Sequence, residues 1–467
     1  MGIEPDHRPV DKQDSAANRP ASPDELRDWI QAETGGTVTR WQQISGGNRC
    51  RSWAVDVDAD SRVEQLYLRY QPPRPPSAEP YTVWREAEFY RALSGSAVPA
   101  PRLIAVHPGH QAILTERAPG RADYRRVTDE SERETIAREF VEALATLHRI
   151  PATGLQVFDA ESTIADCVRR ELAIWRAMYE ETREGDPLID FALAWLESHV
   201  PEPEGRPVLV HGDAGPGNFL FENGHFTALL DWELAHPGDP MEDLAWFSMR
   251  CVMEPVPDFA ARIREYGDLM GAAADLDRIR YHRVFVSTRV VIIRHRNVTG
   301  LPGNSIVSRA LNRRLLVTAM AEATGVALPP RPPLHAPRTE RGALFDHVLH
   351  ELRHDIADVS AEPGVVAAAK NAAKVIKYLR AYDRYGPLIE ATECDELASL
   401  LGERPASLQD GMARLGEALK AGRIPFETAL AFFAGSVARD AELAASSSGG
   451  LAGRSFPPLT RSETDHV

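Results

Sequence analysis

Two short polar motifs, each directly after an apolar run, most constrain how this 467-residue chain can fold. The first is His211-Gly212-Asp213, followed by Asn218 on a loop rich in Gly and Pro. The second is Leu229-Leu230-Asp231-Trp232-Glu233, whose aspartate follows Asp213 by 18 positions. Asp and Asn favour turns for local reasons, but that does not account for two ordered motifs. Phosphoryl transfer needs one carboxylate for an incoming hydroxyl. It also needs a second carboxylate and an amide oxygen to hold Mg²⁺ against nucleotide phosphates.

The region before these motifs predicts a small sheet with one inserted helix. Turn chemistry separates five strand-like runs, and a helix over 81–93 follows the third run. From Glu130 to Ala323 the pattern becomes mostly helical, apart from a strand-containing stretch at 207–232. The five predicted strands are 37–44, 50–57, 65–70, 102–106 and 112–116.

The motif order H-G-D-x-x-x-x-N and then L-D-W-E, after five strands, resembles the aminoglycoside phosphotransferase and choline kinase family over residues 22–323. The resemblance implies an α+β, bilobal protein-kinase-like fold. A small antiparallel sheet lobe would occupy about 22–116 and a mostly helical lobe about 120–323. The implied enzyme is an ATP-dependent small-molecule O-phosphotransferase.

The same resemblance implies roles for individual residues. Asp213 would be the catalytic aspartate, with Asn218 and Asp231 as the Mg²⁺ ligands. Asp239 and Asp243 match carboxylates that brace the catalytic loop. His148 also matches the family, and a lone helix histidine favours a structural role.

Five further residues are candidate nucleotide contacts. Gly46 and Gly47 lie between the first two strands, where backbone amides can approach phosphates. Arg69 stands where the family usually has Lys, with Glu86 as its expected helix partner. Arg69 occurs in kinase-like domains resembling those fused to acyl-CoA dehydrogenases. A plain surface pair of Arg69 and Glu86 is the alternative. The resemblance also implies that Glu116 lies in the segment joining the two lobes, beside the expected adenine site.

Composition narrows the class of protein. The formal charge is −15, which disfavours general nucleic-acid or anionic-membrane binding. The four cysteines are far apart with no C-x-x-C pair, which argues against a disulfide scaffold. The first 20 residues contain no apolar core of a secretory signal, and no run is long enough to cross a bilayer. We therefore expect a cytoplasmic protein.

The rest of the chain predicts an accessory region. A lead over 1–21 and a tail over 446–467 are expected to be disordered. A Pro-rich linker over 324–341 precedes a small all-α bundle over 342–445. His350-Glu351-Leu352-Arg353-His354 matches a zinc-protease pattern. At helical spacing its histidines lie opposite the apolar stripe, so we predict a solvated face.

The acceptor is predicted from charge. Between Met241 and Ala323, twelve arginines stand against nine acids in an acidic chain. Arg278 and Arg289 share a helix face with Arg296 nearby, which favours an anionic acceptor, a hydroxyacyl-CoA first. The alternative interpretation is that these are ordinary surface arginines that pair with acidic residues elsewhere. An aminoglycoside, antibiotic or amino-alcohol kinase and a non-catalytic nucleotide-binding scaffold remain open, as do ATP versus GTP and the oligomeric state.

Overall fold

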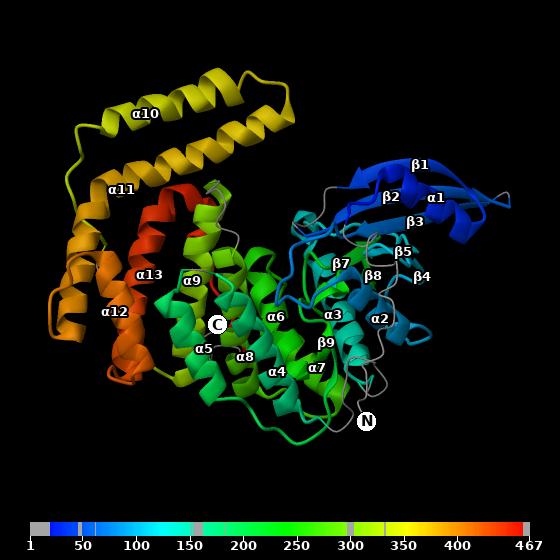
Figure 1. Cartoon of the computed structure of the whole chain (residues 1–467), viewed down its shortest axis with the longest axis horizontal. Coiled ribbons are helices and arrows are strands. Elements are labelled where there is room, and N and C mark those ends of the chain that lie inside the picture. Colours follow the sequence, from blue (N-terminus) through cyan, green and yellow to red (C-terminus); the bar gives the residue numbers. More distant parts are fainter. Residues whose placement is uncertain are drawn as a thin grey trace, which may run out of the picture.

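The protein has a sheet lobe, a larger helical lobe and a C-terminal group of helices (Figure 1). The computed structural model describes residues 19–460 except for 45–48, 61, 151, 153–161, 183, 297–302 and 331–332. The predicted phosphate loop with Gly46 and Gly47, and the lead up to residue 18, lie outside the described residues.

The five predicted strands form one sheet in the order β1-β2-β3-β5-β4, with every neighbouring pair antiparallel. Strand periodicity divides the side chains of β3 between two faces. Leu66, Leu68 and Tyr70 are buried with the apolar face of α1 (Pro23–Thr34), so Arg69 points the other way. The strands are β1 (Thr37–Ile44), β2 (Arg51–Ala59), β3 (Arg62–Tyr70), β4 (Leu103–Val106) and β5 (Ala112–Glu116).

Two capped helices complete the sheet lobe. Helix α1 (Pro23–Thr34) begins with a capping box between Ser22 and Glu25. Helix α2 (Val83–Leu93) is the predicted insertion after the third strand, and the Thr82 side chain caps it. Its buried face carries Glu86 towards the junction of the lobes.

The helical lobe combines short strands with long helices. Strand β6 pairs with β9 and β7 pairs with β8, both antiparallel. The strands are β6 (Val208–Val210), β7 (Phe219–Glu222), β8 (His225–Leu229) and β9 (His236–Gly238), with short 3₁₀ turns η1 (Tyr124–Arg126) and η2 (Trp232–Leu234). The helices are α3 (Glu130–Leu147), α4 (Ile164–Glu180), α5 (Pro187–Ser198), α6 (Pro240–Met253), α7 (Phe259–Met270), α8 (Leu276–Arg296) and α9 (Gly303–Thr324).

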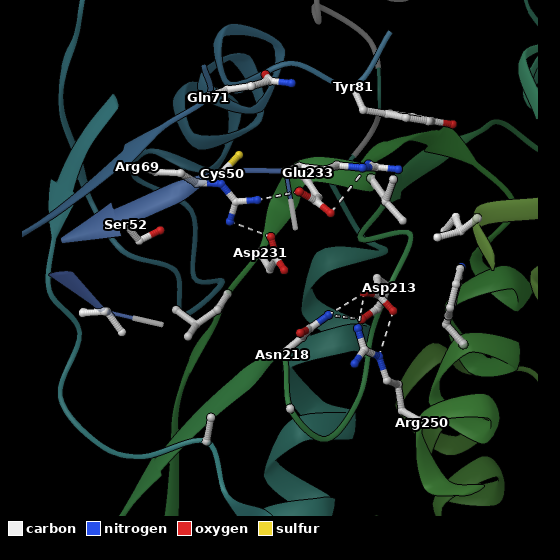
Figure 2. A pocket seen from close by; sticks show the side chains of 18 of the residues that line it. Cys50, Ser52, Arg69, Gln71, Tyr81, Asp213, Asn218, Asp231, Glu233 and Arg250 are labelled. Atoms are coloured by element: carbon white, nitrogen blue, oxygen red, sulfur yellow. Dashed lines mark hydrogen bonds and ion pairs between the residues drawn. The ribbon is translucent and has the colours of Figure 1, made fainter. Parts of the chain in front are cut away.

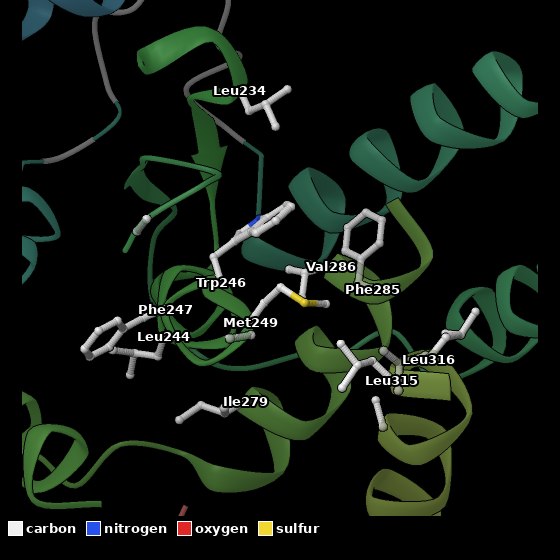
Figure 3. Packing of buried hydrophobic residues seen from close by; sticks show 14 of the residues in the cluster. Leu234, Leu244, Trp246, Phe247, Met249, Ile279, Phe285, Val286, Leu315 and Leu316 are labelled. Atoms are coloured by element: carbon white, nitrogen blue, oxygen red, sulfur yellow. The ribbon is translucent and has the colours of Figure 1, made fainter. Parts of the chain in front are cut away.

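The core of this lobe fixes α6, which stands behind the two motifs. Figure 3 shows Phe247 and Met249 of α6 and Phe285 of α8 among the buried side chains of this core. Phe247 is fully buried. Truncating such a residue to Ala typically costs about 3–5 kcal/mol. Helix α6 is therefore a rigid support for the residues it presents.

The C-terminal helices share this core. Helix α13 packs on α9 and α12 packs on α5, and Leu415 and Phe433 belong to the same cluster as Phe247. Within the predicted bundle, one long helix, α11 (Pro363–Leu401), continues through Pro387. The elements are α10 (Gly342–His350), the π-helical turn η3 (Glu351–Ala357), α11 (Pro363–Leu401), α12 (Leu408–Lys420), α13 (Phe426–Ser448) and the 3₁₀ turn η4 (Gly449–Leu451).

The Ser/Gly-rich end departs from its prediction. Disorder from residue 446 is wrong for 446–460, because α13 continues to Ser448 and the following segment packs back on the protein. The Pro457 carbonyl accepts a hydrogen bond from Arg283 Nη2 at 2.7 Å, and Leu459 is buried. Partners on α8 and in the core, distant in sequence, order this polar segment. None of the helices in the described ranges is both long and apolar enough to cross a membrane.

Candidate active site

The loop after β6 places Asp213 in a tight turn. Gly212 has φ +76°, and a Cβ there would lie 2.2 Å from the Leu234 carbonyl oxygen, so glycine is required. Asp243 of α6 accepts hydrogen bonds from the backbone N–H groups of His211 at 2.7 Å and Gly212 at 2.9 Å. The carboxylate ties this loop to a rigid helix.

A buried chain of polar groups extends this support. His148 Nε2 lies 3.0 Å from Asp243 Oδ2, and His148 Nδ1 lies 2.8 Å from the Tyr266 hydroxyl. Asp239 caps α6 through the Met241 N–H at 2.9 Å. These contacts agree with the structural roles expected for His148, Asp239 and Asp243.

Asp213 faces the cleft, and its carboxylate is held by hydrogen bonds from Arg250 and Asn218 (Figure 2). Arg250 of α6 donates from Nε to Asp213 Oδ1 at 2.8 Å and from Nη2 to Oδ2. Asn218 Nδ2 donates to Asp213 Oδ2 at 2.8 Å and to its carbonyl at 2.9 Å. A Cβ at Gly215 would lie 2.7 Å from Arg250 Cβ, so glycine lets the loop pass this side chain.

Asp231 lies opposite, two residues after the end of β8, with a left-handed φ of 66°. Its Oδ1 accepts from Arg69 Nη1 at 2.7 Å, and Arg69 Nη2 donates to Glu233 at 2.6 Å. Arg69 Nε lies 3.1 Å from Glu86 Oε2. Arg69 therefore joins both lobes, and its pair with Glu86 is buried rather than superficial.

The three carboxyl groups around the Arg69 guanidinium have pKa shifts in opposite directions. Burial raises the pKa of Glu86 to about 8, with Asp231 and Glu233 adding to the rise and Arg69 opposing it. Burial and then Asp231 also raise the pKa of Glu233. Burial opposes ionisation of Asp231, but Arg69 outweighs it and lowers that pKa. Of these three carboxyl groups, Asp231 is therefore the one whose ionised form is favoured.

The site fits a hard divalent cation. Asn218 uses its amide nitrogen on Asp213, and Asp231 uses Oδ1 on Arg69. Within the described ranges, Asn218 Oδ1 and Asp231 Oδ2 accept no hydrogen bond, and both residues line the same cleft. Carboxylate and amide oxygens are ligands that Mg²⁺ accepts.

The cleft between the lobes has a volume of about 1930 Å³. It brings Arg69, Asp213, Asn218, Asp231 and Glu116 together, whereas buried Glu86 supports it from behind Arg69. Glu116 ends β5 with an exposed side chain, and its backbone N–H donates to the Arg102 carbonyl at 2.9 Å. The sequence therefore predicted a group of residues that the fold assembles around one cavity.

The prediction that a basic stripe on α8 faces the acceptor is wrong. Arg278 binds Asp239, and Arg289 is 1% exposed and donates to Glu242 at 2.5 Å. Their helix face turns into the core because acids on α6 pair with them. Only the end of the stripe, Arg296, reaches the cleft, where it binds Glu181 at 2.7 Å.

The H-E-x-x-H segment spans the end of α10 and η3. His347, His350 and His354 are exposed, as the helical spacing predicted. His347 lies 3.3 Å from Glu351, and His354 lies 3.0 Å from Asp358.

Sequence reasoning missed Arg250, Glu233 and Cys50. Arg250 lies 37 positions after Asp213, and no spacing rule links the two. Glu233 is the last residue of the second motif, but the sequence predicted no role for it. Cys50 faces the cleft, where burial raises the pKa of its thiol to about 11. Only its place at the start of a strand beside Gly46 and Gly47 could have indicated this.

A small antiparallel sheet lobe beside a mostly helical lobe, with carboxylates and an amide at their junction, is the architecture of a protein-kinase-like fold. Residues 40–282 match the model of the Phosphotransferase enzyme family, known as APH. This match covers more than half of the chain, and the chain belongs to this family.

Similar proteins come from several sources. Mouse acyl-CoA dehydrogenase family member 10 is 28% identical over 218 residues, which cover 44% of this chain and 20% of that protein. Escherichia coli hygromycin-B 4-O-kinase is 23% identical over 228 residues, 45% of this chain and 62% of that kinase. The chain spans about a fifth to a quarter of the length of the acyl-CoA dehydrogenase relatives. Among solved structures, aminoglycoside phosphotransferase APH(4)-Ia with ADP and hygromycin B has 17% identity and a TM-score of 0.47, covering 65% of this chain and 99% of that one.

Proposed function

We propose that this protein transfers the γ-phosphate of ATP to a hydroxyl group of a small molecule, with hydroxyacyl-CoA thioesters as the favoured acceptors. The proposal rests on the convergence of Asp213, Asn218 and Asp231 in one cleft, with Arg69 beside them. This set supplies a base, two metal ligands and a cation for the nucleotide phosphates.

Asp213 orients the acceptor hydroxyl and takes its proton as the new O–P bond forms and the bond to ADP breaks. Asn218 and Asp231 would hold Mg²⁺, which neutralises charge on the transferring phosphates when bound. Arg69 donates hydrogen bonds to Asp231 and Glu233 across the two lobes. When nucleotide binds, the same guanidinium N–H groups can donate to phosphate oxygens instead. Glu86 keeps Arg69 in place from the opposite side.

The acceptor class follows from the walls beyond Asp213. The cavity has apolar walls there, and Arg294 of α8 and Lys374 of α11 line it together with Arg296. Neither Arg294 nor Lys374 has an acidic partner among the residues that the structure describes, whereas neighbouring Arg296 pairs with Glu181. An amphipathic anion matches such walls better than a polycation does. The apolar walls are Trp246 and Met249 of α6, Val290 and Ile293 of α8, and Val307 and Leu311 of α9.

The names of two relatives point to two acceptor classes. One relative is an acyl-CoA dehydrogenase family member, and the other is a hygromycin-B kinase. The unpaired cations favour the acyl-CoA class, because an aminoglycoside carries several positive charges itself.

An acceptor screen by mass spectrometry tests the proposal. The native chain receives Mg-ATP with hydroxyacyl-CoA thioesters, hygromycin B or choline, and the Asp213→Asn variant serves as the control. A phosphate added to the acyl-CoA only by the native chain supports the proposal. Phosphorylated hygromycin B or choline with untouched acyl-CoA would move the acceptor to the alternative class. Mg-ATP binding without transfer to any acceptor would indicate a scaffold.

A further inference from the structure

A hairpin of α10, η3 and the first half of α11 projects from the rest of the protein (Figure 1), and most of the exposed large apolar residues lie on it. Ten large apolar residues are exposed in the described ranges, and six belong to this hairpin of residues 342–383. Contiguous exposed apolar surface usually marks an interaction site. The six residues are Leu344, Ile356, Val359, Val365, Leu379 and Tyr382.

The hairpin has almost no interior of its own. Helix α10 and η3 contain no buried residue, and in α11 up to Asp383 only Ala369 is buried. Two helices side by side cover one face of each other and leave the opposite faces in water. The stability of such an element comes from packing against something else.

The first half of α11 contains a heptad pattern. Six of its apolar residues, all exposed except half-buried Val375, are spaced by three and four positions alternately, as in the a/d seam of a coiled coil. Val375, at the edge of the seam, also packs beside Ile306 and Ala310 of α9, whereas its neighbours Ala372 and Leu379 are exposed. The seam residues are Val365, Ala368, Ala372, Val375, Leu379 and Tyr382.

This seam is complementary to itself in an antiparallel register. In antiparallel coiled coils an a residue faces a d residue of the other helix. A single alignment of two copies then places Val365 opposite Tyr382, Ala368 opposite Leu379 and Ala372 opposite Val375. Each pair joins a smaller and a larger side chain, so the two surfaces interdigitate.

The charges of the hairpin favour the same direction. Its tip, residues 351–362, carries four carboxylates and one arginine. The segment at its base, which includes the flanking residues 338–341 and residues 377–384, carries five basic and two acidic side chains. Antiparallel pairing places each acidic tip beside this basic segment of the other copy, whereas parallel pairing places like charges together.

We infer that residues 342–383 form a dimerisation arm, through which two copies of this chain pair antiparallel about a two-fold axis. The contact is isologous, since the same six seam residues serve both copies. None of these six residues lines the cleft. The inference goes beyond the proposed phosphotransfer and stands or falls separately from it.

Sedimentation equilibrium of the full chain at about 50 μM tests the pairing. The native chain is expected at twice 51.6 kDa. Leu379→Glu places two charges in the seam and should weaken dimerisation on the order of a hundredfold or more. Leu379 is 44% exposed, so the substitution leaves the fold of each copy intact. Leu269→Glu on α7, where Leu269 is 37% exposed, is the matched control and should remain dimeric.

Cysteine cross-linking tests the register. In the double variant Ala368→Cys with Leu379→Cys, oxidation should form two bridges between copies. Within one chain these positions lie eleven residues apart, about 16 Å along the helix, which is too far for a disulfide. Neither single variant should cross-link, and the native chain reports any background from Cys50.

Three outcomes would overturn the inference. They are a native chain that sediments at 51.6 kDa, a dimer that survives Leu379→Glu, and a cross-linked dimer of Leu379→Cys alone. The last outcome indicates parallel pairing. A monomer that uses Leu379 to bind a different protein would assign the arm to another occupant and also reject a second copy.

Discussion

Arg250 binds the carboxylate of Asp213 at two points, with Nε donating to Oδ1 over 2.8 Å and Nη2 donating to Oδ2. Asn218 adds a third hydrogen bond to the same group. The side chain is thereby positioned by groups on α6 and on its own loop, and it remains on the wall of the cleft. This arrangement suits a residue that must meet an incoming hydroxyl in a fixed direction.

Asp213→Asn should lower kcat by about 10²–10⁴-fold, because the amide keeps the shape of the carboxylate and cannot accept the proton. Mg-ATP affinity and the melting temperature should remain close to native values. Steady-state kinetics, calorimetry and thermal unfolding check this. Asp123→Asn, a partly exposed acid outside the cleft, is the control. Near-native turnover of Asp213→Asn would remove the residue from the proposed role.

Asp231→Ala should weaken Mg-ATP binding by at least about tenfold. Losing a group that merely supports a metal ligand already costs about 10–100-fold in metal affinity. ATP binding in EDTA should change less, since the lost oxygen acts through the metal. Calorimetry with and without Mg²⁺ separates the two, and Glu222→Ala at the cleft wall serves as the control. An equal loss under both conditions would mean that Asp231 acts only through Arg69.

Glu86→Gln should flatten the pH dependence of stability. The pKa of Glu86 is raised from an ordinary value of 4.5 to about 8 in the folded protein. Between these values the folded state holds a proton that the unfolded state has released. This contribution to the free energy of unfolding is fully present below about pH 4.5 and is lost as the pH rises through about 8.

Melting temperatures from pH 5 to pH 9 measure this effect. The native chain should lose more stability than Glu86→Gln between pH 5 and pH 8. Glu88→Gln, on the same helix but paired with Arg91 at the surface, should follow the native profile. If Glu86→Gln followed it too, Glu86 would not titrate in this range.

Arg289→Glu should destabilise the fold by about 3–5 kcal/mol, since it leaves Glu242 without its buried partner and adds a third buried acid beside Glu171. Urea unfolding measures the loss. Arg280→Glu on the same helix, whose arginine pairs with Asp277 near the surface, should cost far less. Native stability together with a raised KM for the acceptor would instead indicate that Arg289 contacts the acceptor.

Arg294→Gln should raise KM for a hydroxyacyl-CoA about tenfold and leave KM for ATP nearly unchanged, because a hydrogen bond to a charged group contributes about 1.5–3 kcal/mol. Arg280→Gln is the matched control, since Arg280 does not line the cleft. Added salt should reduce the difference between the native chain and Arg294→Gln. A raised KM for ATP instead would place Arg294 at the nucleotide.

Local patterns predicted the sheet lobe closely. Strands 37–44 and 112–116 match β1 and β5 at both ends, because hydrophobic alternation and turn residues act over a few positions. The two motifs likewise predicted that Asp213, Asn218 and Asp231 lie near strand ends, since Asp213 follows β6, Asn218 directly precedes β7 and Asp231 follows β8. The family match of residues 40–282 bears out the resemblance that these motifs carried.

Sequence by itself determined the parts of this protein that depend on neighbouring residues: the strands, the Gly-rich turn at Gly212, the helix caps and the order of the two motifs. Only the tertiary structure decided which charges meet. Arg250 reaches Asp213, Arg289 turns into the core towards Glu242, and Arg294 stays in the cleft. The physical reason is that the position of an arginine in a helical pattern does not indicate which acidic residue it will pair with. Its partner, which sets its burial and charge environment, lies tens of residues away on another element.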